Sequence, residues 1–248
     1  MDRTMRLAAA VVLALPCAVL AGPSDYVYTP DVEQGEREID VKLGTWRFND
    51  AGVRESVGSV GFGYGATSWW FTEAYLTVKK ESGARARYDA FEWENKFQLT
   101  EPNRYAVDLG LITEIEIPRE RREEGYEFKI GPLVQGDVGR LRWNANLLFE
   151  RVFHGRSDTP RVTEIGYQLQ AKYPVSPAME VGVQALGEMG KWDHWEPREE
   201  QNHRLGPAIF GKVKLSGRES IKYNAAWLIG ATHGSPDNTI RLQAEYEF

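Results

Sequence analysis

The last ten residues of the chain, 239–248, alternate strictly between two kinds of side chain. Ile240, Leu242, Ala244, Tyr246 and Phe248 are apolar or aromatic, and the residues between them are polar or charged. Successive side chains of a β-strand point to opposite faces, so this stretch predicts a strand with one apolar face. Eleven further strand candidates precede it between residues 37 and 230, most with the same alternation. The chain is therefore expected to be all-β, with about twelve strands.

Residues 1–21 have the composition of a secretory signal peptide. Two arginines precede a charge-free apolar run, and small residues lead up to a cleavage site after Ala21. The apolar run is too short for a membrane-spanning helix, and no later stretch approaches the roughly 18 consecutive apolar residues needed. Cys17 is the single cysteine, so a mature chain beginning at Gly22 is expected to contain no thiol.

Residues 37–248 are predicted to form a transmembrane antiparallel β-barrel. An even number of strands puts both ends of a barrel on one side of the membrane, so both termini are expected in the periplasm. The connections alternate between short turns (66–68, 100–103, 135–139, 173–178 and 216–219) and mostly longer, charged loops (81–87, 118–125, 154–160, 190–202 and 232–238). This asymmetry is typical of outer-membrane barrels. Segment 22–36 shows no useful periodicity and is interpreted as a periplasmic arm or a segment folded into the lumen.

Two stretches of the chain resemble each other, 129–136 (KIGPLVQG) and 204–211 (RLGPAIFG). Proline has no N–H group and cannot donate to a strand ladder. Pro132 and Pro207 are therefore each expected to mark a bulge or bend that helps the barrel to close.

The signal peptide, the hairpin 63–70 (GYGATSWW) and the closing stretch ending in Phe248 together resemble small porin-type outer-membrane barrels of proteobacteria. The resemblance implies a location in the outer membrane of a Gram-negative bacterium, in contact with lipid and lipopolysaccharide. It also implies that Tyr246 and Phe248 form a signal for the barrel-assembly machinery. It identifies no substrate.

Strand parity assigns many charged residues to the inner face of the barrel. Lys or Arg facing lipid near the bilayer midplane costs about 2–4 kcal/mol, so charged side chains are expected to line the lumen. The predicted lumen-lining residues are Glu92, Glu94, Lys96, Asp108, Glu114, Glu116, Glu127, Lys129, Arg142, Glu150, Glu164 and Arg241. Their acidic excess would favour cations in a water-filled path. Twelve strands lie between a filled barrel of about 8 and an open channel of about 16, so the sequence leaves a narrow pore and a lumen closed by ion pairs as alternatives.

Histidines in the predicted outer loops are candidate metal ligands, since imidazole and nearby carboxylates suit zinc or copper. They are His154, His194, His203 and His233. No short spacing between them predicts a preformed site, and histidine is also simply tolerated in polar loops. Loop arginines form a second candidate site, because guanidinium groups bind lipopolysaccharide phosphates in a bidentate fork. These arginines are Arg85, Arg87, Arg119, Arg121, Arg122 and Arg156. The alternative is a solvated loop whose charges pair with each other, since 119–124 (RERREE) carries equal numbers of both signs.

A lipid hydrolase is the third alternative. Residues 154–160 (HGRSDTP) faintly resemble the active-site stretch of outer-membrane phospholipase A, but Arg156 stands where the serine is needed. His233 and Ser235 have the right spacing, yet no partner asparagine can be placed from the sequence. A serine without an oriented base is not a nucleophile, so no enzyme is expected.

Together these features favour a narrow porin-like channel for small solutes or cations. The alternative is a non-conducting barrel whose extracellular loops bind a ligand or metal. No cofactor is expected. The net charge of −6 argues against nucleic acid as a partner, because such binding needs a basic face.

Overall fold

The computed structural model describes residues 22–48, 52–156 and 161–248. The predicted signal peptide, 1–21, lies outside the described residues, as do the last four residues of the 154–160 stretch. No helix long and apolar enough to cross a membrane occurs in the described part of the chain.

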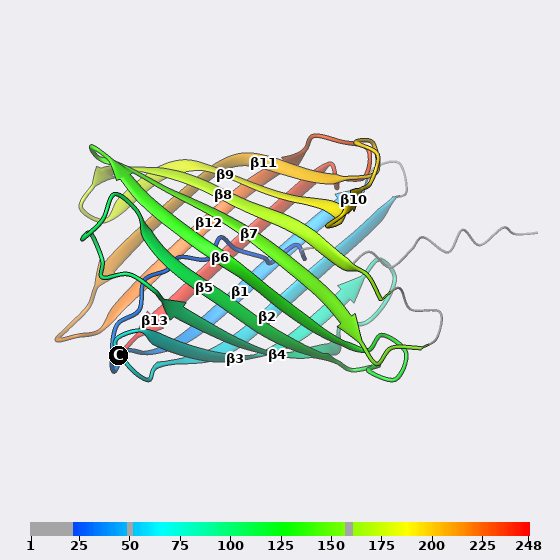
Figure 1. Cartoon of the computed structure of the whole chain (residues 1–248), viewed down its shortest axis with the longest axis horizontal. Coiled ribbons are helices and arrows are strands. Elements are labelled where there is room, and N and C mark those ends of the chain that lie inside the picture. The colour runs from blue at the N-terminus through cyan, green and yellow to red at the C-terminus, as the bar shows by residue number, and fades with distance from the viewer. Residues whose placement is uncertain (1–21, 49–51, 157–160) are drawn as a thin grey trace, which may run out of the picture.

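Twelve long strands form one closed antiparallel barrel (Figure 1). The strands are β1 (Arg37–Phe48), β2 (Val53–Gly65), β3 (Trp70–Glu81), β4 (Arg87–Gln98), β5 (Asp108–Pro118), β6 (Tyr126–Val138), β7 (Leu141–Phe153), β8 (Thr163–Ser176), β9 (Met179–Lys191), β11 (Asn202–Lys214), β12 (Ser220–Gly230) and β13 (Asn238–Glu247). The short β10 (His194–Trp195) pairs only with the end of β9. Because β1 pairs with both β2 and β13, and β8 pairs with β9, the sheet closes and leaves no free edge. The predicted all-β fold with twelve barrel strands is confirmed.

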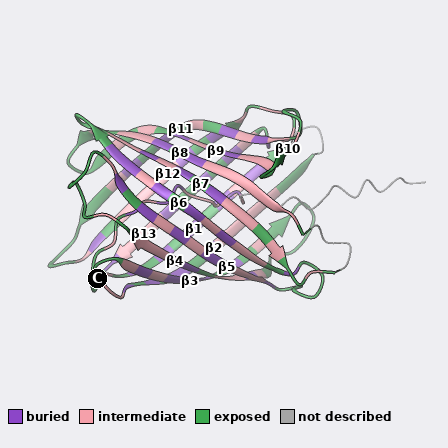
Figure 2. Cartoon of the chain, in the orientation of Figure 1, coloured by how far each residue is buried: buried purple, intermediate pink, exposed green. Residues whose placement is uncertain are grey.

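Burial alternates along each strand in the opposite sense to that of a soluble protein. In β1 the polar residues Glu38, Asp40 and Lys42 are buried, while Ile39 and Leu43 between them are 42% and 48% exposed. Figure 2 shows this alternation, with buried positions concentrated in the middle of the strands. The outer wall is therefore apolar and the inner wall polar, which is the arrangement that a barrel needs when lipid surrounds it.

The two ends of the barrel differ in their connections. Glu38 at the start of β1 pairs with Glu247 at the end of β13, so the first and last strands meet at one end, here called the turn end. Its connections are 66–69, 99–107, 139–140, 177–178 and 215–219. The opposite loop end carries connections 82–86, 119–125, 154–162, 192–201 and 231–237, together with 49–52. Strands β6 and β8 continue to Val138 and Ser176, well into the stretches expected to be turns, and the 99–107 connection is longer than expected.

Pro132 and Pro207 do not form bulges, contrary to expectation. Pairing on either side of each proline follows one continuous register, and the described register shifts lie in the β3–β4 and β8–β9 pairs. The preceding glycines explain this regularity. A Cβ atom at Gly131 or Gly206 would lie 2.1 Å or 1.9 Å from a backbone carbonyl oxygen of the neighbouring strand. Each Gly-Pro pair thus permits a close approach between strands rather than an inserted residue.

Candidate functional site in the barrel lumen

Segment 22–36 lies inside the barrel and does not form a strand. It leaves β1 at the turn end and runs to the middle of the barrel (Figure 1). Pro23 and Pro30 are among the most deeply buried residues of the described chain. The lumen is therefore occupied by the protein's own N-terminal segment, and its wall has to be described together with that segment.

A row of charged residues runs across five neighbouring strands of the inner wall. Each member pairs across the sheet with the next, from β3 to β7: Glu73, Glu94, Glu114, Lys129 and Glu150. Four of the five are acids. Like charges on adjacent strands destabilise a sheet unless cations or hydrogen-bond donors compensate them.

Two lysines supply that compensation. Lys42, reaching in from β1, places its Nζ 3.2 Å from Glu94 Oε1, and only 4% of its surface is exposed. Lys129 Nζ lies 3.0 Å from Glu114 Oε1 and 3.6 Å from Glu150 Oε1. Both pairs are buried, so removal of either partner would leave an uncompensated charge inside the barrel.

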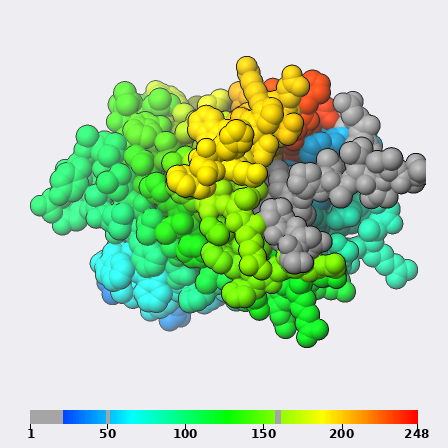
Figure 3. Space-filling model, turned by 45° about the vertical axis from the view of Figure 1, so that its right-hand side comes forward, coloured from blue at the N-terminus to red at the C-terminus, as the bar shows by residue number. Residues whose placement is uncertain are grey.

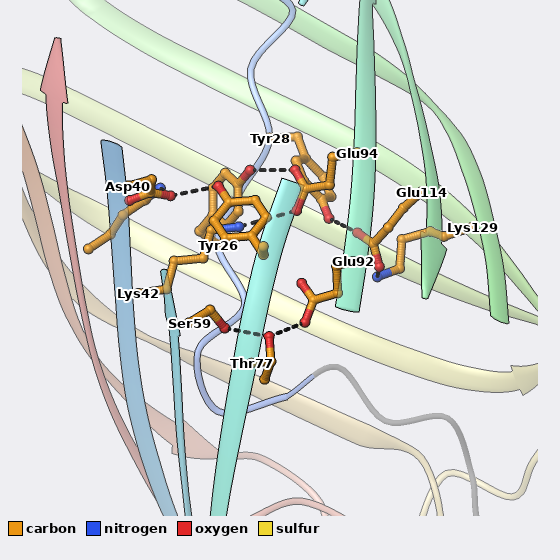
Figure 4. A network of polar contacts seen from close by, with 12 residues as sticks. Tyr26, Tyr28, Asp40, Lys42, Ser59, Thr77, Glu92, Glu94, Glu114 and Lys129 are labelled. Carbon is orange, nitrogen blue, oxygen red and sulfur yellow. Dashed lines mark hydrogen bonds and ion pairs between the residues drawn. The ribbon is translucent and has the colours of Figure 1, made fainter. Parts of the chain in front are cut away.

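Two tyrosines of the segment donate hydrogen bonds to the same carboxylates (Figure 4). Tyr26 donates its hydroxyl to Glu94 Oε2 at 2.9 Å, and Tyr28 donates to Glu114 Oε2, also at 2.9 Å. Lys42 further lies 4.0 Å from the centre of the Tyr26 ring, a cation–π contact. The wall and the segment thus form two equivalent units, each with a lysine and a tyrosine on the two oxygens of one glutamate.

Main-chain groups of the segment are also bonded by the wall. The Tyr28 N–H donates to Gln168 Oε1 at 3.1 Å, and Asn146 Nδ2 donates to the Tyr28 carbonyl at 2.9 Å. Nearer the turn end, the Val32 N–H donates to Gln98 Oε1 at 2.9 Å. Buried main-chain N–H and C=O groups need hydrogen-bond partners. In a sheet the neighbouring strand supplies them, and here the side-chain amides of the wall supply them to the irregular segment.

Apolar side chains on the inner wall cover the segment at two places. Val27 packs in a buried cluster with Leu186, Ala208, Phe210, Ala226 and Leu228. On the other side, Tyr28 packs with Ile112, Leu133 and Leu148, and Tyr26 joins them. Such residues would be unfavourable in an aqueous lumen, so their presence indicates that the wall is built around the segment.

Glycines on the inner wall make room for the segment. A Cβ atom at Gly44 would lie 2.1 Å from the Pro23 carbonyl oxygen, and one at Gly65 would lie 2.0 Å from that of Glu33. Any larger side chain at these positions would have to displace the segment's backbone.

We therefore expect Gly44→Leu to loosen the start of the segment. Because the mature chain is expected to contain no other thiol, a Ser24→Cys variant can be labelled with a hydrophilic maleimide. Adding Gly44→Leu should raise the labelling rate about tenfold. This corresponds to a change of about 1.4 kcal/mol in the free energy of detaching the start of the segment from the wall. Gly58→Leu is the matched control, since Gly58 contacts the outward-facing Leu43. Equal rates in the two double variants would contradict this account of Gly44.

Two chains of hydrogen-bonded side-chain amides start from Arg241 and run along the inner wall in opposite directions. In the first, each side chain donates to the next, from Arg241 through Gln184, Gln170, Asn144 and Gln135 to Asp31 of the segment. In the second, the donors run from Arg241 through Asn224 and Gln243 to Asp40. Each chain begins at the Arg241 cation and ends at an aspartate. The amide oxygens therefore point towards the cation and the amide NH2 groups towards the anion, and the hydrogen bonds polarise one another.

Towards the loop end, three glutamates lie side by side on β4, β5 and β6. Glu92 pairs across the sheet with Glu116, and Glu116 pairs with Glu127. Glu92 accepts a hydrogen bond from Thr77 Oγ1 at 2.5 Å, and Thr77 is in turn bonded to Ser59 at 2.9 Å (Figure 4). No lysine or arginine stands at these three paired positions, so three carboxyl groups lie next to one another on this part of the wall.

At the turn end a cavity of about 830 Å³ lies between the segment and the wall. Its lining includes residues of the segment, such as Tyr26 and Glu36, and wall residues from β1, β3, β4 and β13. The cavity is large enough to hold many water molecules, each of which takes up about 30 Å³ of liquid.

The residues predicted to line the lumen occupy different environments. Glu94, Glu114, Lys129 and Arg241 are buried at the contact with the segment or its supporting amides. Arg142 and Lys96 line the cavity; Arg142 forms an ion pair with Asp137, with 2.9 Å between Nε and Oδ1, and Lys96 lies over the Phe71 ring. Asp108 accepts a hydrogen bond from the Asn103 N–H at 2.8 Å. Glu164 lies on β8, cross-strand from Glu150 on β7.

The histidines do not gather into one site within the described residues. His194 lies in β10 and His203 in β11, so neither is in a loop as expected. Both ring nitrogens of His203 already have partners, with Nδ1 3.0 Å from the Tyr167 hydroxyl and Nε2 2.7 Å from Gln201 Oε1. His154 packs edge-on against Tyr126 at the end of β7. No described group of three side chains placed to share a metal ion includes a histidine.

Connections 192–201 and 231–237 lie against each other at the loop end, where the first stands out from the wall in yellow in Figure 3. Thr232 Oγ1 donates to the Gln201 carbonyl at 2.5 Å, and the Gly234 N–H donates to the Glu199 carbonyl at 2.8 Å. Ser235 Oγ donates to the His203 carbonyl at 3.0 Å and accepts from its N–H at 2.7 Å. The Ser235 hydroxyl thus holds connection 231–237 against the start of β11.

Several residues of the site were missed by sequence reasoning. Tyr26 and Tyr28 belong to a segment without periodicity, and Lys42 is absent from the residues predicted to line the lumen. The available signal was the apolar side chains at inward positions, such as Ile112, Leu133 and Leu186. An inner wall that alternates polar and apolar patches predicts an occupant with apolar groups of its own.

These features define a β-barrel of the outer-membrane type, here with an internal N-terminal segment, and solved outer-membrane barrels share its fold. An outer-membrane channel from Pseudomonas putida F1 superposes with a TM-score of 0.59 at 12% identity, covering 91% of this chain and 98% of that one. The NanC porin gives 0.52 at 11% identity over 85% and 98% of the two chains. The transport unit of the autotransporter AIDA-I from Escherichia coli gives 0.51 at 11% identity over 87% and 90%. No family model and no curated protein matches the sequence.

Proposed function

We propose that the protein is a narrow, cation-preferring channel of the bacterial outer membrane, and that segment 22–36 controls its path. The observation that carries the proposal is the acidic excess of the inner wall on both sides of the segment. Towards the loop end stand Glu92, Glu116 and Glu127, and towards the turn end the cavity is lined by more carboxylates than ammonium and guanidinium groups. Acidic rings of this kind favour cations in an aqueous path.

In this proposal the segment closes the path where it meets the inner wall. Its hydroxyl and main-chain hydrogen bonds to Glu94, Glu114 and Gln168 are contacts that water can replace at small cost. The apolar contacts of Val27 and Tyr28 favour the closed state, because opening exposes them. Conduction then requires the segment to shift or leave, and the acids that it covers become part of the path.

The remaining parts of the proposal follow from the same barrel. The apolar outer wall contacts lipid, the turn end with both strand termini faces the periplasm, and Tyr246 and Phe248 at the end of β13 are read by the assembly machinery. Small cationic solutes are the proposed cargo. The loop end, with its arginine-bearing connections, faces lipopolysaccharide.

Ion selectivity in a planar bilayer tests this proposal. With a potassium chloride gradient across the purified protein, the reversal potential should show preference for potassium, both in the full chain and in a variant lacking residues 23–32. Replacing Glu92, Glu116 and Glu127 together by Gln should move the reversal potential towards zero, because three wall charges disappear. The matched control replaces Glu120, Glu123 and Glu124 in the exposed 119–125 connection by Gln. Preference for chloride, or an equal shift in both triple variants, would contradict the proposal.

A further inference from the structure

Side-chain amides of the inner wall bind main-chain groups of the internal segment. Gln168 Oε1 accepts the Tyr28 N–H at 3.1 Å, and Asn146 Nδ2 donates to the Tyr28 carbonyl at 2.9 Å. Asn146 Nδ2 also lies 3.0 Å from Gln168 Oε1, so the two amides hold each other in position. Gln98 Oε1 accepts the Val32 N–H at 2.9 Å. Every residue except proline offers such an N–H and C=O group, so these contacts suit the main chain of any extended peptide.

Successive side chains of the segment reach opposite sides of the lumen, as they do in an extended peptide. Tyr26 and Tyr28 are bonded to β4 and β5, and their ring centres lie 4.9 Å apart (Figure 4). Val27, between them, packs against residues of β9, β11 and β12. Pro23 and Pro30 have no N–H groups, and the closed sheet offers no free edge. The segment therefore lies in the lumen as a separate, extended chain.

The wall receives these side chains at two chemically different places. Val27 contacts a purely apolar cluster. Tyr28 packs with apolar residues of β5, β6 and β7, while its hydroxyl donates to Glu114 Oε2 at 2.9 Å. The second place thus fits a side chain with an apolar stem and a hydrogen-bond donor at its end. Lysine and arginine have this form as well as tyrosine.

The charged row of the wall contains two more carboxylates than ammonium groups. The carboxylates are Glu73, Glu94, Glu114 and Glu150, and the ammonium groups bonded to them are those of Lys42 and Lys129. Tyrosine is neutral, so the segment leaves this difference in place at Tyr26 and Tyr28. A basic side chain at either position would form a charge-assisted hydrogen bond, which is about twice as strong as a neutral one.

We propose that the inner wall is a binding site for short, extended, basic peptides, and that residues 23–32 occupy it in place of such a ligand. The inference rests on the proposed channel function, whose cationic solutes it identifies as peptides. The cavity at the turn end reaches Tyr28 and Glu94, so a peptide has access to the site from that mouth. An entering peptide takes over the contacts of the segment, which stays attached to β1.

Displacement of the segment in the detergent-solubilised, full-length mature Ser24→Cys variant tests the site. The probe is a synthetic peptide of residues 22–32 (GPSDYVYTPDV). A tethered segment competes at an effective concentration on the order of millimolar, so the peptide is used at about 10 mM. It should raise the maleimide labelling rate at least about tenfold, because peptide and segment compete for the same wall. Heat-modifiable migration on a gel establishes that the barrel remains folded.

Single changes in the peptide test the preference for basic side chains. With Tyr28→Lys, the peptide should reach the same labelling rate at a several-fold lower concentration, because its ammonium group meets Glu114. With Tyr28→Glu, it should have little effect, because two carboxylates would then face each other. An equal effect of these two peptides, or labelling that no peptide accelerates, would overturn the inference.

Methylation of one peptide nitrogen tests main-chain recognition separately. An N-methyl group at Tyr28 removes the donor to Gln168 and should raise the peptide concentration needed at least about tenfold. The matched control is methylated at Thr29, which lines the cavity and whose N–H forms no hydrogen bond in the described structure. Equal losses from the two methyl groups would contradict recognition of the main chain.

The labelling assay needs no ion current, so it separates this inference from the channel proposal. Displacement by peptide in a barrel that prefers chloride would contradict the channel proposal alone. A potassium-selective barrel whose segment no peptide displaces would contradict the peptide site alone.

Discussion

A variant lacking residues 23–32 is expected to conduct ions at least about tenfold better than the full chain, because the deletion empties a lumen that twelve strands leave wide enough for a narrow path. The deletion removes Tyr26, Val27 and Tyr28 and leaves the root of the segment attached to β1. The lysine–glutamate pairs of the wall remain, so the strands should still form a complete barrel. Single-channel recordings on folded protein measure the effect.

A length-matched control separates the loss of contacts from the loss of chain. Replacing residues 23–32 by glycine and serine should also raise conductance, but with frequent brief closures, since a flexible linker still visits the lumen. Tyr26→Phe with Tyr28→Phe should give rarer openings than either, because only the hydroxyl bonds to Glu94 and Glu114 are lost. A folded deletion variant that conducts no better than the full chain would rule out the segment as the barrier.

The second large effect is expected from Lys42→Met. The substitution keeps an apolar stem of similar length but leaves Glu94 buried without its cation. Breaking a buried ion pair in this way costs about 3–5 kcal/mol in the free energy of unfolding. Urea unfolding of the barrel in lipid vesicles measures that loss.

Two controls identify the cause of the destabilisation. Lys79→Met breaks the Lys79–Glu55 pair, where the lysine side chain is 27% exposed, and should cost at most about 1 kcal/mol. Lys42→Met combined with Glu94→Gln should be more stable than Lys42→Met alone, because the unpaired charge is gone. Equal losses in the free energy of unfolding for Lys42→Met and Lys79→Met would show that the buried Lys42–Glu94 pair does not stabilise the barrel more than an exposed pair.

The barrel could be predicted from the sequence because its signal is local. Strict alternation, as at 239–248, fixes which face of each strand is apolar, and the even strand count follows from counting such stretches. The location of segment 22–36 could not be predicted in the same way. Tyr28 is bonded to Gln168 and Asn146, which are 140 and 118 residues away, and no short pattern encodes those contacts.

The errors have physical causes as well. Pro132 and Pro207 were expected to distort the sheet, but the preceding glycines let the neighbouring strand come close enough to keep the register. His203 was expected in a loop, yet β11 begins one residue before it, and the His203 imidazole stacks on the Tyr167 ring. In both cases a residue on another strand decided the outcome, and that residue is invisible in a single stretch of sequence.

The wide spread of the segment's partners sets an order of events. Asp31 is held at the end of a chain of amides that begins at Arg241 in β13, and Arg204 in β11 reaches the Gly22 carbonyl, 182 residues away along the chain. The cradle for the segment does not exist until the last strand has joined the first. Residues 22–36 are thus synthesised before the strands of the barrel but take their place after the strands have paired. Contacts of such long sequence separation are also the slowest to form. Newly closed barrels therefore pass through an interval in which the lumen is formed and still empty.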